Sequence, residues 1–292
     1  MHRAPLDSKT SDRSPRVPDD TAGRATLHTT ARAPALPVVL AWIVAGLALA
    51  ASATGLLLPT VYRDNALVIA AFHGNDAVTL LVAVPGLVAA LLGARRHPTL
   101  ARFGRLGMLL YTLYNYVFYL FGAAFNELFL VYVALVVCSG FGLGLGLAEG
   151  LAVALARKFR ARTPVRSVAA YMIGFATLLG GMWTALSLSF LFTGVVPVAI
   201  TQTGHPTGVV FATDLTLLVP GLLAGGVLLY RRRPWGYLVA PIVLIKASTY
   251  GVAMIAMSAF AGLGADSLLP VWAGLTLGCV VCAGLLLGGL ER

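Results

Sequence analysis

The sequence predicts an all-α protein: a polytopic membrane bundle of eight transmembrane helices, arranged as two parallel four-helix repeats. Of the 292 residues, 59% are hydrophobic and 11% are charged, and the mean hydropathy is +0.87. A soluble core of this size could not bury so much apolar surface. Apolar runs near 20 residues match a hydrocarbon core of roughly 30 Å. We expect spans at about 36–58, 74–94, 105–124, 128–155, 168–193, 209–230, 236–260 and 268–289.

An internal duplication is the second observation behind this fold. The stretch Thr79–Arg96 reads TLLVAVPGLVAALLGARR, and Asp214–Arg231, 135 residues further on, reads DLTLLVPGLLAGGVLLYR. Without a gap, the Pro-Gly-Leu triplet at 85–87 falls on the same triplet at 220–222. Duplicated membrane units commonly enclose a central site between their halves. The duplication therefore directs attention to the interface between the two copies.

The spans divide into repeat 1 at 36–166 and repeat 2 at 167–292. Four spans per copy is an even number, so both copies enter the membrane in the same direction, as in parallel repeats. We expect glycines to allow close packing between the halves. The candidates are Gly140, Gly142, Gly144, Gly146 and Gly150 in span four and Gly274 and Gly278 in span eight.

Residues 1–35 form a separate segment, rich in Pro, Ser, Thr, Arg and Asp and without apolar periodicity. Such a segment cannot bury enough surface to fold, so we expect a disordered cytoplasmic tail. An apolar run with Ala-Ser-Ala at 51–53 suggests a signal peptide, but the polar region before it is too long and the run continues to Leu58.

The net charge of +10 is distributed in alternate loops. Six Lys or Arg residues precede the first span, and basic clusters follow spans two, four and six, whereas the other loops hold only Arg63. This alternation is the positive-inside pattern, so it predicts a cytoplasmic (inner) membrane protein with both termini cytoplasmic. It also explains the charge without nucleic acid as a partner. Anionic lipid headgroups are the partners expected at the basic face.

Lys246 in span seven and Glu149 in span four are charged residues at similar depth from the cytoplasmic face. An unpaired charge there costs at least ~2.5 kcal/mol on the lenient insertion scale. We therefore expect them to form an ion pair, which either locks the two halves together or belongs to a substrate site.

Span three holds a dense polar and aromatic cluster that includes Tyr111, Tyr114 and Asn115. Under the repeat offset, Tyr111 falls on Lys246 and Asn115 falls on Tyr250. Each half thus offers a polar stripe at the same place. These residues are candidates for substrate binding in a lined cavity, and the alternative is a hydrogen-bond network between helices.

Asp76 and Asp214 are expected near the outer starts of corresponding helices, and they are the candidate catalytic acids or proton carriers. Two carboxylates that face one cavity between the halves would repel each other, which would keep a proton available near neutral pH. The alternative is a structural role, in which each carboxylate caps the positive N-terminus of its helix.

Metal and cofactor sites are not predicted. His73, His205, Glu127 and Asp266 fall on the same side of the membrane, but no HxxxH or HxH spacing links them. The sequence also contains no Walker lysine motif, no GxSxG, no HExxH and no haem-binding CxxCH.

The segments YNYVFYLFGAAFNELFLVYVAL (114–135) and RRRPWGYLVAP (231–241) resemble those of an uncharacterised family of multi-pass bacterial integral membrane proteins. The resemblance covers residues 36–290. It implies a single membrane domain and brings no activity with it.

The sequence favours two functions from different classes, and a structural or assembly role remains open beside them. The first is binding or transport of a small, mostly apolar molecule between the two repeats, because buried charge is scarce. The second is a membrane-embedded acid/base enzyme, similar to a cyclase or isomerase, that acts on a lipid, prenyl chain or quinone through Asp76 and Asp214.

Overall fold

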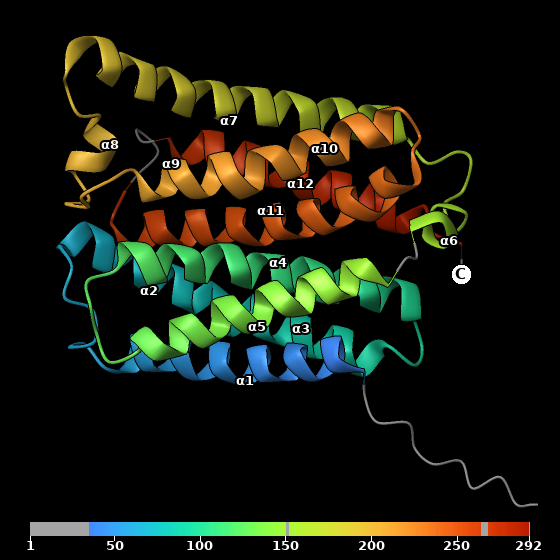
Figure 1. Cartoon of the computed structure of the whole chain (residues 1–292), viewed down its shortest axis with the longest axis horizontal. Coiled ribbons are helices and arrows are strands. Elements are labelled where there is room, and N and C mark those ends of the chain that lie inside the picture. Colours follow the sequence, from blue (N-terminus) through green and yellow to red (C-terminus); the bar gives the residue numbers. More distant parts are fainter. Residues whose placement is uncertain (1–34, 150–151, 264–267, 292) are drawn as a thin grey trace, which may run out of the picture. The chain divides into compact units, whose positions relative to one another are not determined.

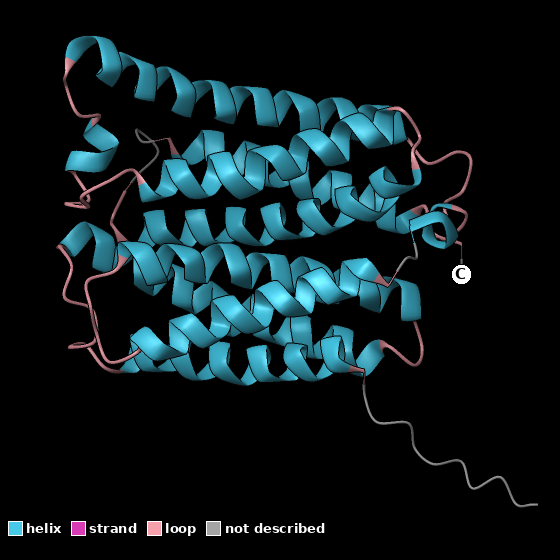
Figure 2. Cartoon of the chain, in the orientation of Figure 1, coloured by secondary structure: helices cyan, strands magenta, loops and turns pink. Residues whose placement is uncertain are grey.

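The structure of the protein is a computed structural model that describes residues 35–149, 152–263 and 268–291. Ala35–Arg292 form one compact unit, whose helices lie roughly parallel or antiparallel to one another (Figure 1). The described residues form helices joined by loops, without a β-strand, as Figure 2 shows. Apart from Ala35, the tail expected at 1–35 lies outside the described residues.

The helical elements comprise long helices and short ones. Their bounds are α1 (Leu36–Leu57), α2 (Ala66–Val78), η1 (Thr79–Ala83), α3 (Val84–Gly93), α4 (Pro98–Gly122), α5 (Phe129–Ala148), α6 (Ala152–Ala156), α7 (Val165–Thr193), α8 (Val198–Thr201), α9 (Val209–Thr213), η2 (Asp214–Leu218), α10 (Val219–Tyr230), α11 (Pro234–Phe260) and α12 (Leu269–Gly288). Elements α2, η1 and α3 follow one another without a break, as do α9, η2 and α10.

Seven helices in the described part of the chain are long and apolar enough to cross a membrane. They confirm an all-helical, multi-pass membrane protein. The remaining long helix, α4, is not among these seven, and it contains Arg102 and Arg105 as well as the polar cluster around Asn115. The number of eight transmembrane helices and the repeat arrangement therefore remain predictions.

The second span begins earlier than its sequence suggests. Asn65 is the N-cap of α2, where its side chain accepts a hydrogen bond from the Val68 backbone N–H at 3.0 Å. The helix therefore starts at Ala66 and not near residue 74. As a result Asp76 lies well inside the helix, and its predicted capping role is wrong.

Two π-helical segments interrupt the spans at positions that match under the 135-residue offset. The segment η1 starts at Thr79 and η2 starts at Asp214. Pro85 and Pro220 lie two residues beyond them, in the first turn of the next helix. Because proline lacks an N–H and its ring crowds the carbonyl four residues earlier, the wider π turn relieves the clash.

Helices α4 and α11 lie side by side near the centre of the bundle (Figure 1). Helices α3 and α5 pack on α4, and α10 and α12 pack on α11, whereas α2 also packs on α11. Helix α7 is at one edge, against α10 and α12, and α1 is at the opposite edge (Figure 1). The two halves of the chain therefore meet mainly where α11 contacts α2 and α4.

The glycines at this interface are not those that the sequence suggests. An added Cβ at Gly74 of α2 would lie 2.4 Å from the Met257 backbone nitrogen, and one at Gly107 of α4 would lie 2.6 Å from the Ile245 side chain. Both neighbours belong to α11.

The predicted glycines lie elsewhere. A Cβ on Gly142 or Gly146 of α5 would contact leucines of the first half, and one on Gly278 would meet Tyr171 of the second half. Gly150 lies outside the described residues. The glycine-rich helices thus pack within their own halves.

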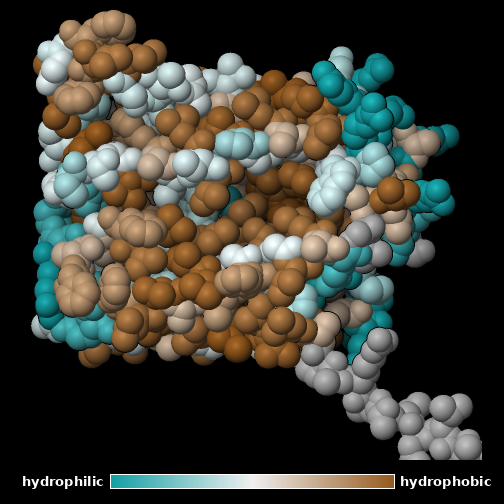
Figure 3. Space-filling model, viewed as in Figure 1, coloured by the Kyte–Doolittle hydropathy of each residue, from teal (hydrophilic) through white to brown (hydrophobic). Residues whose placement is uncertain are grey.

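Basic loops gather at one end of the helices, which we call the basic end. The Lys158 ammonium donates to Thr99 at 2.8 Å, and the Arg160 N–H donates to the Gly289 carbonyl at 2.8 Å. The loops after α3 and α6 and the end of α12 are therefore neighbours. Figure 3 shows hydrophilic residues at this end and an apolar surface along the helices beside it.

Candidate functional site

Asp214 in η2 is a buried carboxylate, 5% exposed, with two side-chain donors from other helices. The Tyr114 hydroxyl of α4 donates to Oδ1 at 2.6 Å, and the Trp183 indole N–H of α7 donates to Oδ2 at 2.8 Å. Trp183 also stacks on Phe211 of α9, with ring centroids 4.1 Å apart. The carboxylate is thus fixed by one residue from the first half of the chain and one from the second.

Lys246 of α11 is 1% exposed and lies beside this carboxylate. Its Nζ is 3.2 Å from the centroid of the Tyr114 ring and 4.5 Å from that of Tyr250. Within the described residues it has no hydrogen-bond partner and no carboxylate within ion-pair distance. Cation–π contact with the two tyrosines is therefore its main stabilising interaction.

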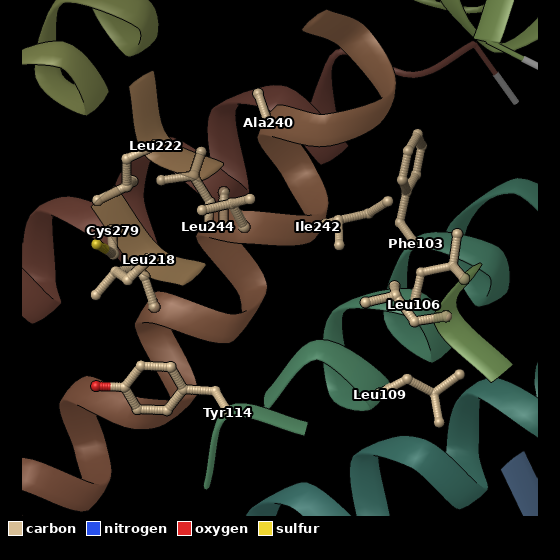
Figure 4. Packing of buried hydrophobic residues seen from close by; sticks show 14 of the residues in the cluster. Phe103, Leu106, Leu109, Tyr114, Leu218, Leu222, Ala240, Ile242, Leu244 and Cys279 are labelled. Atoms are coloured by element: carbon tan, nitrogen blue, oxygen red, sulfur yellow. The ribbon is translucent and has the colours of Figure 1, made fainter. Parts of the chain in front are cut away.

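Tyr114 connects the two charged residues, because its hydroxyl contacts Asp214 and its ring face contacts Lys246. Figure 4 shows its ring directed away from Leu109 of the same helix, on the side where Leu218 and Cys279 lie. The side chain reaches from α4 into the second half.

A mainly apolar pocket of about 110 Å³ lies next to this group, and we call it the Asp214 pocket. Its wall is formed by α7, α9, η2, α11 and α12. The lining residues are Phe175, Leu179, Trp183, Val210, Asp214, Leu218, Ala247, Tyr250, Gly251, Met254, Trp272, Leu275, Thr276 and Cys279. All of them belong to the second half, so this pocket is not between the predicted repeats.

The pocket is closed on one side and open on another. Phe175, Leu179 and Trp183 of α7 are buried. Met254 of α11 and Trp272 of α12 are half-buried. The pocket therefore reaches the molecular surface on the side of α11 and α12.

The predicted ion pair between Lys246 and Glu149 is not formed. Glu149 follows the end of α5 and pairs with Arg102, and its other oxygen lies 3.7 Å from an Arg105 nitrogen. Both arginines are on α4 near the basic end. The carboxylate thus interacts with the nearer guanidinium groups and takes no part in the Asp214 pocket.

Asp76 of α2 belongs to a second buried polar group, which we call the Asp76 cluster. The Tyr62 hydroxyl donates to Oδ2 at 2.5 Å and the Tyr119 hydroxyl to Oδ1 at 3.0 Å. The rings of Tyr116 and Tyr132 lie 5.3 and 5.4 Å from that of Tyr119. Their buried hydroxyls have no hydrogen-bond partner among the described residues.

The other predicted residues of span three form a network. The Asn75 amide donates to Asn115, with 2.5 Å between nitrogen and oxygen. The Tyr111 hydroxyl lies 2.9 Å from the Thr79 hydroxyl and 3.5 Å from Asn75 Oδ1. This arrangement is the hydrogen-bond network between helices that the sequence left open as the alternative to a cavity.

The structure therefore separates the predicted site residues into groups. Asp214, Tyr114, Tyr250 and Lys246 lie together, whereas Asp76 is not among the residues that line the Asp214 pocket. Neither carboxylate faces lipid, but they do not share this pocket.

Sequence reasoning missed Tyr62 and the two pocket tryptophans, Trp183 and Trp272. An indole N–H inside an apolar span requires an acceptor, so Trp183 was a detectable signal for a buried carboxylate nearby. Tyr62 carries no comparable signal, because it lies in a loop.

The histidines lie against aromatic rings. His73 is 5.9 Å from the Tyr62 ring, and His205 is 5.8 Å from the Phe118 ring. Burial lowers the pKa of His205, which lies in the loop before α9. Among the described residues, no three His, Cys, Asp or Glu side chains gather as metal ligands would. Asp266, which the sequence places on this side, lies outside the described residues.

The chain matches no protein-family model, no curated protein and no solved structure. A function must therefore be argued from the Asp214 pocket itself.

Proposed function

We propose that this membrane protein binds, and transports, a small and mostly apolar molecule in the Asp214 pocket. The observation that supports it is an apolar pocket of about 110 Å³ with one carboxylate in its wall. An engineered apolar cavity of about 150 Å³ is known to bind benzene, and this pocket, which also opens to the surface, approaches that volume. A few polar groups in an apolar wall are typical of small-molecule sites.

The hydrogen bonds of Asp214 favour binding over acid/base catalysis. Each of its oxygens already accepts a bond from a side chain, Tyr114 or Trp183. A general acid or base must exchange a proton with its substrate at hydrogen-bond distance. The two donors fix the orientation of this carboxylate, which suits it to orienting a ligand through its remaining acceptor positions.

Features that match under the 135-residue offset favour a carrier. The π-helical segments recur at the repeat offset, and the halves meet along α4 and α11, which also correspond under that offset. In transporters with parallel repeats, one half moves against the other. Tyr114 links the halves at the carboxylate, so such a motion would change the surroundings of the ligand.

Filling the pocket should weaken binding. We expect Ala247→Leu, which adds bulk to the pocket wall, to weaken binding of 2-(4-bromophenyl)ethanol at least ~10-fold. Ala259→Leu, on the exposed end of the same helix, is the matched control and should leave binding unchanged. Bromine quenches tryptophan fluorescence, and Trp183 and Trp272 line the pocket.

The parent protein for this measurement carries Trp42→Phe and Trp235→Phe. Both indoles are exposed, so probe dissolved in the detergent or lipid would also quench their fluorescence. Equal quenching in the Ala247→Leu and Ala259→Leu variants would mean that the probe does not enter the pocket.

We also propose that the basic end is cytoplasmic, in the inner membrane, where it meets anionic lipid headgroups. Reporter fusions after residues 163 and 232 should then report the cytoplasm. A fusion after residue 203 should report the opposite side, since its loop holds no Lys or Arg. A cytoplasmic signal from 203 would contradict this orientation.

A further inference from the structure

The wall of the Asp214 pocket contains four aromatic side chains and one carboxylate. The aromatic residues are Phe175, Trp183, Tyr250 and Trp272, and they come from α7, α11 and α12. No Lys, Arg or His is among the lining residues. Aromatic faces carry negative potential and attract cations, and several of them around one site recognise ammonium groups. The wall therefore has the chemistry of a site for an organic cation.

The carboxylate retains capacity for a further donor. A carboxylate has about four acceptor positions. Tyr114 and Trp183 use one position on each oxygen of Asp214. The remaining positions are available to an N–H donor of a ligand, and a charged donor gives the stronger hydrogen bond.

The protein already places one amino group beside this pocket, against aromatic rings. Lys246 Nζ lies over the rings of Tyr114 and Tyr250, and the latter ring also lines the pocket. Lys246 itself is not among the lining residues, so it leaves the volume free. Among the described residues it is the basic group that acts on Asp214, and in its protonated form it competes electrostatically with any cationic ligand.

We propose that the ligand of the Asp214 pocket is a hydrophobic amine, bound as its ammonium cation. This inference rests on the proposed binding function and names the class of molecule. The ammonium group donates to Asp214, and the apolar part lies among Phe175, Leu179, Met254 and Trp272. The titratable groups around the carboxylate are Tyr114, Tyr250, Lys246 and Cys279, and Lys246 is the basic one among them.

Two probes of nearly equal size and shape test this proposal. 2-(4-Bromophenyl)ethylamine is an ammonium ion at pH 7, and 2-(4-bromophenyl)ethanol is neutral. In the parent with Trp42→Phe and Trp235→Phe, we expect the amine to quench the pocket tryptophans with about 10-fold higher affinity than the alcohol. Cation–π contact and a charge-assisted hydrogen bond supply this difference.

Two substitutions should change the affinity for the amine in opposite directions. Asp214→Asn removes the negative charge, while its amide oxygen still accepts from Trp183 and its nitrogen can donate to Tyr114. We expect the amine to lose at least ~10-fold in affinity, to the level of the alcohol. Lys246→Met removes the competing cation, and we expect the amine to bind several-fold more tightly. The affinity for the alcohol should change less than that for the amine in both variants, because the alcohol carries no charge.

The outcomes separate the two proposals. If neither probe quenches the pocket tryptophans, the proposed binding function fails. If the alcohol binds and the amine shows no preference, binding in the pocket remains and the amine proposal is wrong. The amine proposal is also wrong if Asp214→Asn leaves the preference intact or if Lys246→Met weakens amine binding while alcohol binding is unchanged.

Discussion

Replacing Gly74 by alanine should separate α2 from α11 and lower the free energy of unfolding by about 3 kcal/mol, the upper range for overpacking. The added Cβ would lie 2.4 Å from the backbone nitrogen of Met257 and 2.7 Å from the carbonyl carbon of Ala256. Backbone atoms of a helix cannot rotate away as a side chain can. The thermal unfolding midpoint in detergent, together with the monodisperse fraction, measures the loss.

Two further glycines give a graded control. At Gly46 of α1 an added Cβ meets nothing within 4 Å, so Gly46→Ala should leave stability unchanged or raise it slightly. At Gly107 the neighbour is the Ile245 side chain, which can shift, so Gly107→Ala should cost less than Gly74→Ala. If Gly74→Ala is as stable as Gly46→Ala, the close contact of α2 with α11 is wrong.

The fold class could be predicted because it depends only on composition and on the length of the apolar runs. The helices at the interface between the two halves could not be predicted, because the number of glycines in a helix does not show which face meets another helix. Gly142 and Gly146 pack on leucines of their own half, while single glycines, Gly74 and Gly107, meet α11. Finding them requires knowledge of the partner helix.

The start of the second span was mispredicted for a related reason. The run from His73 to Asp76 is polar, and a polar run normally ends a membrane span. Here Tyr62 and Tyr119 donate to Asp76, so the carboxylate can lie inside the bundle. These donors are 14 and 43 residues away in sequence, and no local sequence pattern predicts that they contact Asp76.

Similar depth in the membrane was also insufficient to predict an ion pair. Lys246 and Glu149 were placed at the same level, but depth is one coordinate of three. Glu149 lies beside α4 and meets Arg102 and Arg105.

The Asp214 pocket was partly predictable, because Asp214, Tyr114, Tyr250 and Lys246 were all candidates. Trp183 was a signal for a buried acceptor, whereas Trp272, which also lines the pocket, resembles an ordinary lipid-facing residue in the sequence.

Replacing Asp76 by alanine should destabilise the first half strongly, whereas Asp76→Asn should be nearly neutral. Alanine leaves the Tyr62 hydroxyl, which is buried, without its acceptor and opens a void beside it. A buried polar group left without a partner costs about 1–3 kcal/mol, and the lost packing adds to this. We expect a total of about 3 kcal/mol, measured by thermal or chemical unfolding in detergent.

Asparagine can satisfy the Asp76 cluster because Tyr119 has a second acceptor. The Tyr119 hydroxyl lies 3.2 Å from the Phe72 carbonyl, so it can donate there while it accepts from the amide nitrogen. The amide oxygen then accepts from Tyr62. By the same logic, Tyr62→Phe should destabilise more than Tyr119→Phe, because among the described residues the Tyr62 hydroxyl donates to Asp76 alone, whereas the Tyr119 hydroxyl divides its hydrogen bond between Asp76 and the Phe72 carbonyl. If Asp76→Asn is as unstable as Asp76→Ala, the negative charge itself is required, and the cluster must then contain a cation that balances it.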